Sequence, residues 1–354
     1  MKNGGVSVKK QVFAGSLPIG GDAPVSIQSM TNTDTRDVEK TLEQIRRLAA
    51  CGCELVRVSV YDEACVKAVK ALADQSPVPL AADIHFDYRL ALGAVENGIQ
   101  KLRINPGNIG SADRVKLVAD CAKAHRVPIR IGVNAGSLEK DIVKKYGGAT
   151  AEGMAESAMN HVRLLEDAGF DDIVISLKSS SVPMTVQAYR LMDKICDYPL
   201  HVGVTEAGLP GQGTLKSAIG IGTLLMEGIG DTIRVSLTGD PCEEPKAALE
   251  ILRALEMRQG IRFVSCPTCG RTRIDVPGIA RRVQKEFADA DKNVTIAVMG
   301  CVVNGPGEAR DADIALCGGD HCGEVFLHGK PVRKLTGDLA EGMAQAVREY
   351  WDDL

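Results

Sequence analysis

Short apolar runs rich in Val, Ile and Leu recur along the first 258 residues. There are eight of them, at residues 25–29, 55–60, 79–84, 101–105, 128–133, 172–177, 200–204 and 232–237. Continuous apolar runs of this length, bounded by polar and glycine-rich segments, are typical of parallel strands buried on both faces. The pattern therefore predicts eight buried strands.

Each run is followed by a segment with helical periodicity. After the first run, Val38, Leu42, Ile45 and Leu48 fall on one helical face, and charged residues occupy most of the other. Eight strands alternating with eight helices over about 250 residues predict a (β/α)8 TIM barrel. A doubly wound open sheet shows the same alternation, but the glycine-rich fingerprint and the Walker A loop of its nucleotide-binding versions are absent. We favour the barrel.

The pattern changes after Gly260. The remaining segment holds five of the eleven cysteines, apolar runs at 294–299 and 314–316, and helical periodicity at 278–288 and 339–350. We therefore expect two domains, a TIM barrel over residues 1–258 and a small α+β domain over residues 259–354.

Composition narrows the class of protein. The 42 Lys and Arg residues against 46 Asp and Glu residues give a net charge of −4, which argues against a protein that coats nucleic acid. No apolar run approaches the roughly 20 residues needed to cross a membrane. The odd number of cysteines and the lack of an apolar export segment favour a reducing, cytoplasmic location without disulfides.

The predicted strands end in cationic residues, which is unusual for apolar parallel strands. These residues are Arg57, Arg103, Arg130, Lys178 and Arg234. A buried arginine is costly unless an anion meets it, and for any single case Asp83 or Glu206 is an adequate ion-pair partner. Two carboxylates do not neutralise four arginines and a lysine. We therefore predict a pocket for a small polyanion the size of a diphosphate at the carboxyl ends of the strands.

Other polar residues follow the same strand ends. They are His85, Asn105, Asn134, Thr205, Glu206 and Ser236. Glu206, among so many cations, is a candidate acid or base, with a counter-ion to Arg234 or Lys178 as the alternative. The loop at 208–214 is either a backbone phosphate site at a helix N-terminus or an ordinary loop.

Three cysteines in the last hundred residues have the spacing of a metal centre. Cys266 and Cys269 form a C-x-x-C pair, and Cys301 lies in the glycine-rich block 300–308, which ends in Glu308. Three thiolates leave one coordination position for an exchangeable ligand, which Glu308 could supply, and this favours an open 4Fe–4S cluster. The alternative is a zinc ribbon, with Cys317 and Cys322 as an imperfect second pair.

These motifs together closely resemble the bacterial 4-hydroxy-3-methylbut-2-enyl diphosphate synthase family. The resemblance rests on C-P-T-C-G-R at 266–271, G-C-V-V-N-G-P-G-E at 300–308, I-Q-S-M-T-N-T at 27–33, and the strand-end motifs. It covers essentially the whole chain. It implies an oxidoreductase of the methylerythritol phosphate route to isoprenoids, a 4Fe–4S cluster, a flavodoxin or ferredoxin as electron donor, and a head-to-tail homodimer.

The resemblance also implies roles for individual residues. The cluster ligands would be Cys266, Cys269, Cys301 and Glu308. The five strand-end cations would grip 2-C-methyl-D-erythritol 2,4-cyclodiphosphate, helped by His85, Asn105, Asn134 and Ser236, and Glu206 would lie beside its carbon skeleton. Cys317 and Cys322 receive no role.

Two other functions compete with this reading. One is a hydro-lyase of the aconitase type, in which an open iron acts only as a Lewis acid and no electrons enter. The other is a zinc-ribbon binding protein with a barrel attached. A requirement for a reductant would separate the synthase from the hydro-lyase. Stoichiometric zinc in colourless protein would instead support the zinc-ribbon protein.

Overall fold

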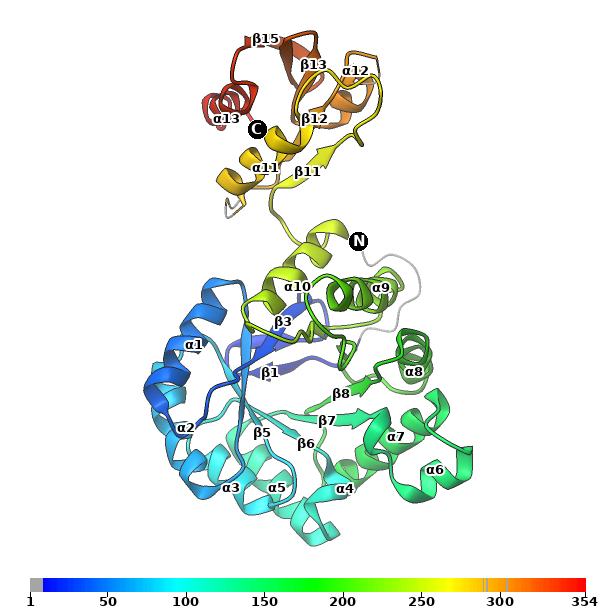
Figure 1. The fold of residues 1–354 in the computed structure, drawn as a ribbon. Helices are drawn as coiled ribbons and strands as arrows, with labels where there is room; N and C mark the ends of the chain where they lie inside the picture. Colours follow the sequence, from blue (N-terminus) through cyan, green and yellow to red (C-terminus); the bar gives the residue numbers. More distant parts are fainter. Residues whose placement is uncertain (1–8, 289, 291, 304) are drawn as a thin grey trace. The chain divides into compact units, whose positions relative to one another are not determined.

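The computed structural model describes residues 9–288, 290, 292–303 and 305–354, and for Pro106, Gly107, Pro306 and Glu308 it describes the backbone alone. The chain forms two compact units, Met1–Leu255 and Glu256–Leu354. The sequence analysis placed the division after residue 258. The larger unit is built from alternating strands and helices, whereas the smaller one carries a separate sheet (Figure 1).

The eight predicted strands are all present and parallel. They are β3 (Ser26–Met30), β4 (Leu55–Ser59), β5 (Leu80–Asp83), β6 (Lys101–Ile104), β7 (Ile129–Asn134), β8 (Ile173–Lys178), β9 (His201–Val202) and β10 (Thr232–Ile233). They pair in the order β8-β7-β6-β5-β4-β3-β10-β9. A parallel bridge between Ile175 and Leu200 joins the two ends of this order. The sheet is therefore a nearly closed barrel, and the open doubly wound alternative is wrong.

Helices follow every barrel strand. They are α1 (Val38–Ala50), α2 (Glu63–Gln75), α3 (Tyr88–Glu96), α4 (Pro106–Ile109), α5 (Ala112–His125), η1 (Ala135–Ser137), α6 (Lys140–Tyr146), α7 (Ala151–Asp167), α8 (Val182–Ile195), α9 (Gln212–Met226) and α10 (Glu243–Ala254). Several begin at side-chain caps, as where the carboxylate of Asp62 accepts from the backbone N–H of Cys65. The predicted apolar face of α1 is buried at Leu42, Ile45 and Leu48.

Alternation along the strands separates an apolar layer from a polar interior. Val56 and Val58 of β4 belong to the apolar core shared with the helices, and Arg57 between them faces the other way, into the barrel. The same alternation places Leu102 and Ile104 of β6 in the outer core. The cations of the strand ends therefore lie on the inner surface of the barrel.

An N-terminal hairpin, β1 (Val12–Ala14) and β2 (Leu17–Ile19), was not predicted. Its Val12, Ala14 and Ile19 pack with Leu55, Ala81 and Val174, which lie at or near the starts of barrel strands. The hairpin thus fills the end of the barrel at which the strands begin. Strands of three residues carry too little alternation to be recognised from sequence.

The second unit is a five-stranded mixed sheet with two principal helices. Its elements are β11 (Arg262–Ser265), α11 (Val276–Phe287), β12 (Thr295–Met299), α12 (Gly305–Glu308), η2 (Ala309–Asp311), β13 (Ile314–Gly319), β14 (Cys322–Leu327), β15 (Lys330–Thr336) and α13 (Leu339–Glu349). Strands β11 to β13 are parallel, and β13 to β15 are antiparallel. This confirms the predicted TIM barrel followed by a small α+β unit. Among the described residues of both units, no helix has the length and apolarity that crossing a membrane requires.

Candidate active site

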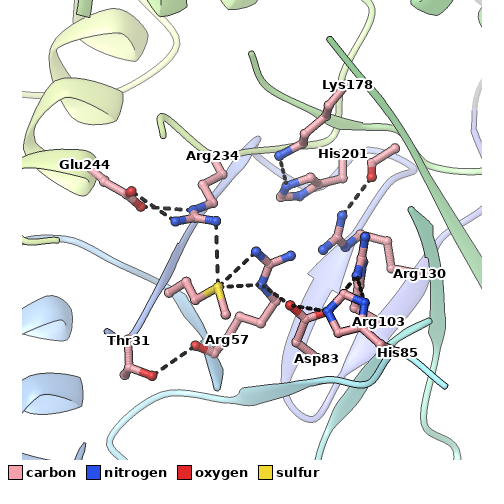
Figure 2. A network of polar contacts seen from close by, with 12 residues as sticks. Thr31, Arg57, Asp83, His85, Arg103, Arg130, Lys178, His201, Arg234 and Glu244 are labelled. Atoms are coloured by element: carbon pink, nitrogen blue, oxygen red, sulfur yellow. Dashed lines mark hydrogen bonds and ion pairs between the residues drawn. The ribbon is translucent and has the colours of Figure 1, made fainter. Parts of the chain in front are cut away.

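The five predicted cations come together inside the barrel (Figure 2). They project from β4, β6, β7, β8 and the segment after β10, so residues spread over 178 positions of sequence share one chamber. Arg130 is 2% exposed and Lys178 7%. Burial of this extent means that each cation must find its partners inside the protein or in a ligand.

Asp83 of β5 is the carboxylate at the centre of the arginines. Its Oδ1 lies 3.0 Å from Nη1 of Arg103, and its Oδ2 lies 3.7 Å from Nε of Arg57. Burial alone would raise the pKa of Asp83, but Arg57, Arg103 and Arg130 outweigh it and lower the pKa to about 2. The ion-pair alternative is therefore correct for Asp83.

Arg234 is paired with Glu244, a residue that the sequence analysis missed. Glu244 lies in the first turn of α10 and is 3% exposed. Its two oxygens accept from Nε and Nη2 of Arg234, both at 3.0 Å. Acidic residues are ordinary in the first turn of a helix, so nothing in the sequence marked this one as a partner of Arg234.

Three interior cations have no ion pair with a carboxylate among the described residues. They are Lys101, Arg130 and Lys178. Arg130 donates from Nη1 to the hydroxyl of Ser176 at 2.7 Å, and Lys101 is fully buried with no hydrogen-bond partner in the part of the chain that is described. Burial, reinforced by the neighbouring arginines, lowers the pKa of Lys101 and of Lys178 well below the ordinary value. These side chains have no carboxylate partner, and a polyanion would supply the missing negative charge.

Two glycines of the barrel interior make room for these cations. A Cβ on Gly132 of β7 would lie 2.7 Å from Nε of Arg103. A Cβ on Gly203, just after β9, would lie 3.0 Å from Nζ of Lys178 and 2.4 Å from the carbonyl oxygen of Arg234. The side chains of Arg103 and Lys178 therefore occupy space that any other residue at these positions would fill.

The remaining predicted site residues lie at or just beyond the carboxyl ends of barrel strands. These are His85, Asn105, Asn134, Thr205, Glu206 and Ser236. His85 is largely exposed and lies 3.8 Å from Asp83 (Nε2 to Oδ2). The carboxyl ends of barrel strands form one face, so the fold gathers these side chains near the cations.

Glu206 has an unusual backbone. Its φ is +52°, in the left-handed region that non-glycine residues seldom adopt, and its side chain is exposed. Strained residues of this kind cluster at functional sites. Within the described residues Glu206 makes no ion pair, so the counter-ion alternative gains no support. The following loop leads through Gly211, with φ +92°, into the N-terminus of α9.

Sequence reasoning also missed Met30, Lys101 and His201. The Sδ of Met30 lies 3.2 Å from Nε and 3.0 Å from Nη2 of Arg57. Lys101 is two residues before Arg103 on the same strand, so strand alternation places both on the inner face. The two-residue spacing between Lys101 and Arg103 could therefore have identified Lys101 as an inward-facing residue from the sequence.

The three cysteines of the metal motif line one cavity of the second unit. The cavity measures about 340 Å³ and includes Cys266, Cys269 and Cys301 in its wall. The backbone N–H of Gly300 donates to Sγ of Cys266 at 3.1 Å. A backbone hydrogen bond from Arg271 lowers the pKa of Cys269, which favours the thiolate that metals bind.

The donor set is one that soft metal centres use, because cysteine thiolates are their usual ligands. In the described part of the chain no group of three His, Cys, Asp or Glu side chains lies close enough together to hold one metal ion, but Cys266, Cys269 and Cys301 line the same cavity. Cys317 is buried in a small apolar cluster, and burial raises its pKa to about 12. Such a thiol is a poor half of a second zinc pair. The side chain of Glu308, the predicted fourth ligand, lies outside the described residues.

Known structures share the barrel. A sialic acid synthetase from Leptospira borgpetersenii is 15% identical, with a TM-score of 0.51, over 70% of this chain and 88% of its own. A 3-dehydroquinate dehydratase from Geobacillus kaustophilus is also 15% identical, with a TM-score of 0.50, over 70% of this chain and 98% of its own. At this identity the likeness shows the fold alone.

Much closer relatives exist in sequence. Proteins named 4-hydroxy-3-methylbut-2-en-1-yl diphosphate synthase (flavodoxin) match over nearly the full length. The protein from Geobacter sulfurreducens is 56% identical over 96% of this chain and 97% of its own, and that from Caldanaerobacter subterraneus is 57% identical over 91% of both. Residues 9–249 match the GcpE TIM-barrel domain, and residues 262–349 match the GcpE protein C-terminal domain. The chain belongs to the GcpE family.

Proposed function

We propose that this chain catalyses the two-electron reductive ring opening and dehydration of 2-C-methyl-D-erythritol 2,4-cyclodiphosphate. The product is (E)-4-hydroxy-3-methylbut-2-enyl diphosphate, and water leaves. The observation that carries the proposal is the chamber of interior cations, in which Lys101, Arg130 and Lys178 have no carboxylate ion pair among the described residues. The names of relatives more than 50% identical specify the product, 4-hydroxy-3-methylbut-2-en-1-yl diphosphate, and the family resemblance supplies the cyclic diphosphate as the substrate.

The cations bind and hold both phosphates. Arg57, Arg103, Arg130, Lys178 and Arg234 neutralise the charge that collects on the diphosphate as the ring C–O bond breaks. His85, Asn105, Asn134, Thr205 and Ser236 at the strand ends orient the substrate. Asp83 and Glu244 keep three of the arginines fixed before the substrate arrives, which lowers the cost of ordering them on binding.

Glu206 supplies the proton that accompanies loss of the hydroxyl group as water. Its exposed carboxyl group and left-handed backbone at the carboxyl end of the barrel support this role. Glu206→Gln keeps the size of the side chain and removes the transferable proton. Normal turnover by Glu206→Gln would assign the proton to another group.

The second unit holds a 4Fe–4S cluster on Cys266, Cys269, Cys301 and Glu308, with Glu308 as the exchangeable ligand. When bound, such a cluster supplies electrons one at a time, received from a flavodoxin or, as the alternative, a ferredoxin. Support comes from the three cysteines that line one cavity and from the names of the relatives, which specify flavodoxin. Cys301→Ala should lose the iron absorbance while inorganic diphosphate still binds to the barrel unit.

A head-to-tail homodimer would let the cluster of one subunit serve the barrel of the other. One apolar stripe supports self-association: Leu215, Ile219 and Met226 of α9 are each at least 60% exposed. Mixing Cys301→Ala with Arg57→Ala subunits tests this arrangement. Proven heterodimers with no recovered activity would argue against a shared site.

The deciding experiment is anaerobic turnover of the cyclic diphosphate by iron-reconstituted protein, with the linear diphosphate followed by mass. Product that requires both cluster and reductant supports the proposal. Cluster-loaded protein that forms no product would overturn it.

The relatives give no support to a hydro-lyase or a zinc-ribbon protein. We also propose a cytoplasmic location, in line with the biosynthetic activity for which the relatives are named.

A further inference from the structure

Inside the barrel, Lys178 contacts a histidine to which no role has been assigned. Nζ of Lys178 lies 3.1 Å from Nε2 of His201, and His201 is fully buried (Figure 2). Neither side chain forms an ion pair with a carboxylate in the described structure. Both groups become positive on protonation, so a hydrogen bond between them requires that one be neutral.

The fold constructs this contact from adjacent strands. Lys178 ends β8, and His201 begins β9. Gly203 lies two residues beyond His201, where a Cβ would be 3.0 Å from Nζ of Lys178. The missing side chain lets the lysine reach across to the histidine.

Tyr189 of α8 fixes the two strands at this point. Its hydroxyl donates to the carbonyl oxygen of His201 at 2.5 Å and accepts from the backbone N–H of Leu177 at 3.0 Å. His201 is therefore held through its main chain, and its ring is free to act on Lys178. Substituting the ring leaves this anchor in place.

The pair is surrounded mainly by positive charge. The charged and titratable groups of the surrounding elements are Arg57 (β4), Asp83 (β5), Lys101 (β6), Arg130 (β7), Tyr189 (α8), Arg234 (after β10) and Glu244 (α10). The two carboxylates are already paired with arginines. Arginine keeps its proton under all ordinary conditions, so repulsion among these charges is relieved at lysine and histidine. Burial, then the nearby cations, lower the pKa of both Lys178 and His201 well below their ordinary values.

We propose that His201 is the positioning residue for Lys178, and that this lysine takes up one proton when the diphosphate enters the barrel. The inference rests on the proposed diphosphate site. His201 remains neutral and accepts a hydrogen bond at Nε2, which directs Nζ toward the ligand. The proton comes from the solvent, and no covalent bond forms or breaks.

The proposal fixes the sign of a pH effect. Phosphate oxygens favour the ammonium form, so the pKa of Lys178 is higher in the complex than in the free enzyme. Below the free-enzyme pKa the lysine is already charged, and binding takes up no proton. Between the two values uptake approaches one proton, and affinity falls about ten-fold per pH unit as pH rises.

Calorimetric titration of the full-length enzyme with inorganic diphosphate measures this uptake directly. Titrations at one pH in buffers of different ionisation enthalpy give the number of protons bound. We expect net uptake in the wild type and a roughly ten-fold or greater loss of affinity in His201→Leu, which removes a hydrogen bond to a charged group. His201→Gln retains an acceptor and should recover affinity within a few-fold, with uptake preserved because the lysine is the group that titrates.

Lys101→Met is the matched control, because Lys101 is the other buried lysine of the chamber. It should still take up a proton on binding. Binding without uptake in the wild type, unchanged affinity in His201→Leu, or uptake abolished only by Lys101→Met would each overturn the inference. Those results concern the diphosphate alone, so they leave the turnover proposal standing, whereas failed turnover with normal proton uptake would reject only the proposed reaction.

Discussion

The carboxylate of Glu244 gives a sharp test of how the barrel holds its arginines. Oε1 accepts from Nη2 of Arg234 at 3.0 Å and from the backbone N–H of Leu237 at 3.2 Å. Oε2 accepts from Nε of Arg234 at 3.0 Å and from the hydroxyl of Ser29 at 2.8 Å. Replacement of Glu244 by Gln turns one of these oxygens into an NH2 donor, and the cost depends on which one.

An NH2 in place of Oε1 would face two fixed N–H donors. An NH2 in place of Oε2 would face only one, because the hydroxyl of Ser29 can rotate and become the acceptor. The second orientation is cheaper and loses one charge-assisted hydrogen bond to Arg234. We therefore expect Glu244→Gln to lower the free energy of unfolding of the barrel unit by about 1.5–3 kcal/mol. Glu244→Ala should cost about 3–5 kcal/mol, because it leaves a largely buried guanidinium without its partner.

Urea unfolding followed by two probes measures this effect with an internal control. The only tryptophan, Trp351, packs against Phe287 in the second unit, with ring centroids 5.6 Å apart. Its fluorescence should therefore report a transition that Glu244 substitutions do not move, while far-UV circular dichroism includes the barrel. A Glu244→Gln barrel within 0.5 kcal/mol of the wild type, or a Glu244→Ala barrel no less stable than Glu244→Gln, would refute the reasoning.

Three further predictions concern the same interior. The pKa of Asp83, about 2 when folded, lies below its unfolded value near 3.9, so the ionised carboxylate stabilises the protein by about 2.5 kcal/mol above pH 4 and this stabilisation is lost as pH falls toward 2. Acid titration of Asp83→Asn should therefore show a shallower decline in stability. Gly132→Ala places a Cβ 2.7 Å from Nε of Arg103, and should weaken diphosphate binding at least ten-fold in calorimetry while Gly136→Ala, in open space, does not. Tyr189→Phe leaves the carbonyl of His201 without its donor, and should lower barrel stability in urea by about 1–3 kcal/mol.

The barrel was predictable because parallel strands that are buried on both faces appear in the sequence as continuous apolar runs. Even β9 and β10, whose regular pairing covers two residues each, lie within apolar runs of five and six residues. The β1–β2 hairpin was not predictable, since three-residue strands have no period to detect. Its position depends on contacts with Leu55, Ala81 and Val174, which are distant in sequence.

The cations of the site were predictable for a related reason. An arginine in an apolar parallel strand violates the usual pattern of burial, so Arg57, Arg103 and Arg130 stand out in sequence. The residues that contact these cations do not stand out in the sequence. Glu244 occupies a helical first turn where an acid is expected, and His201 opens a strand that is otherwise apolar. The proposed fourth cluster ligand, Glu308, was a candidate from its place on the glycine-rich loop, but one carboxylate has no distinctive spacing, and its role was assigned by the family resemblance.

The inward-facing glycines show why even a complete list of site residues would not have given the site. Arg103 pairs in register with Arg130, which sets two like charges opposite each other on the inner face of β6 and β7. Gly132 is two residues beyond Arg130 on that face, and it opens the space into which the guanidinium of Arg103 turns. From there Nη1 of Arg103 reaches Asp83 at 3.0 Å. Each glycine accommodates a cation from another strand, so the match between them depends on barrel register. Register is a property of the whole sheet, and it sets these mutually repelling side chains in the arrangement that we propose binds the diphosphate.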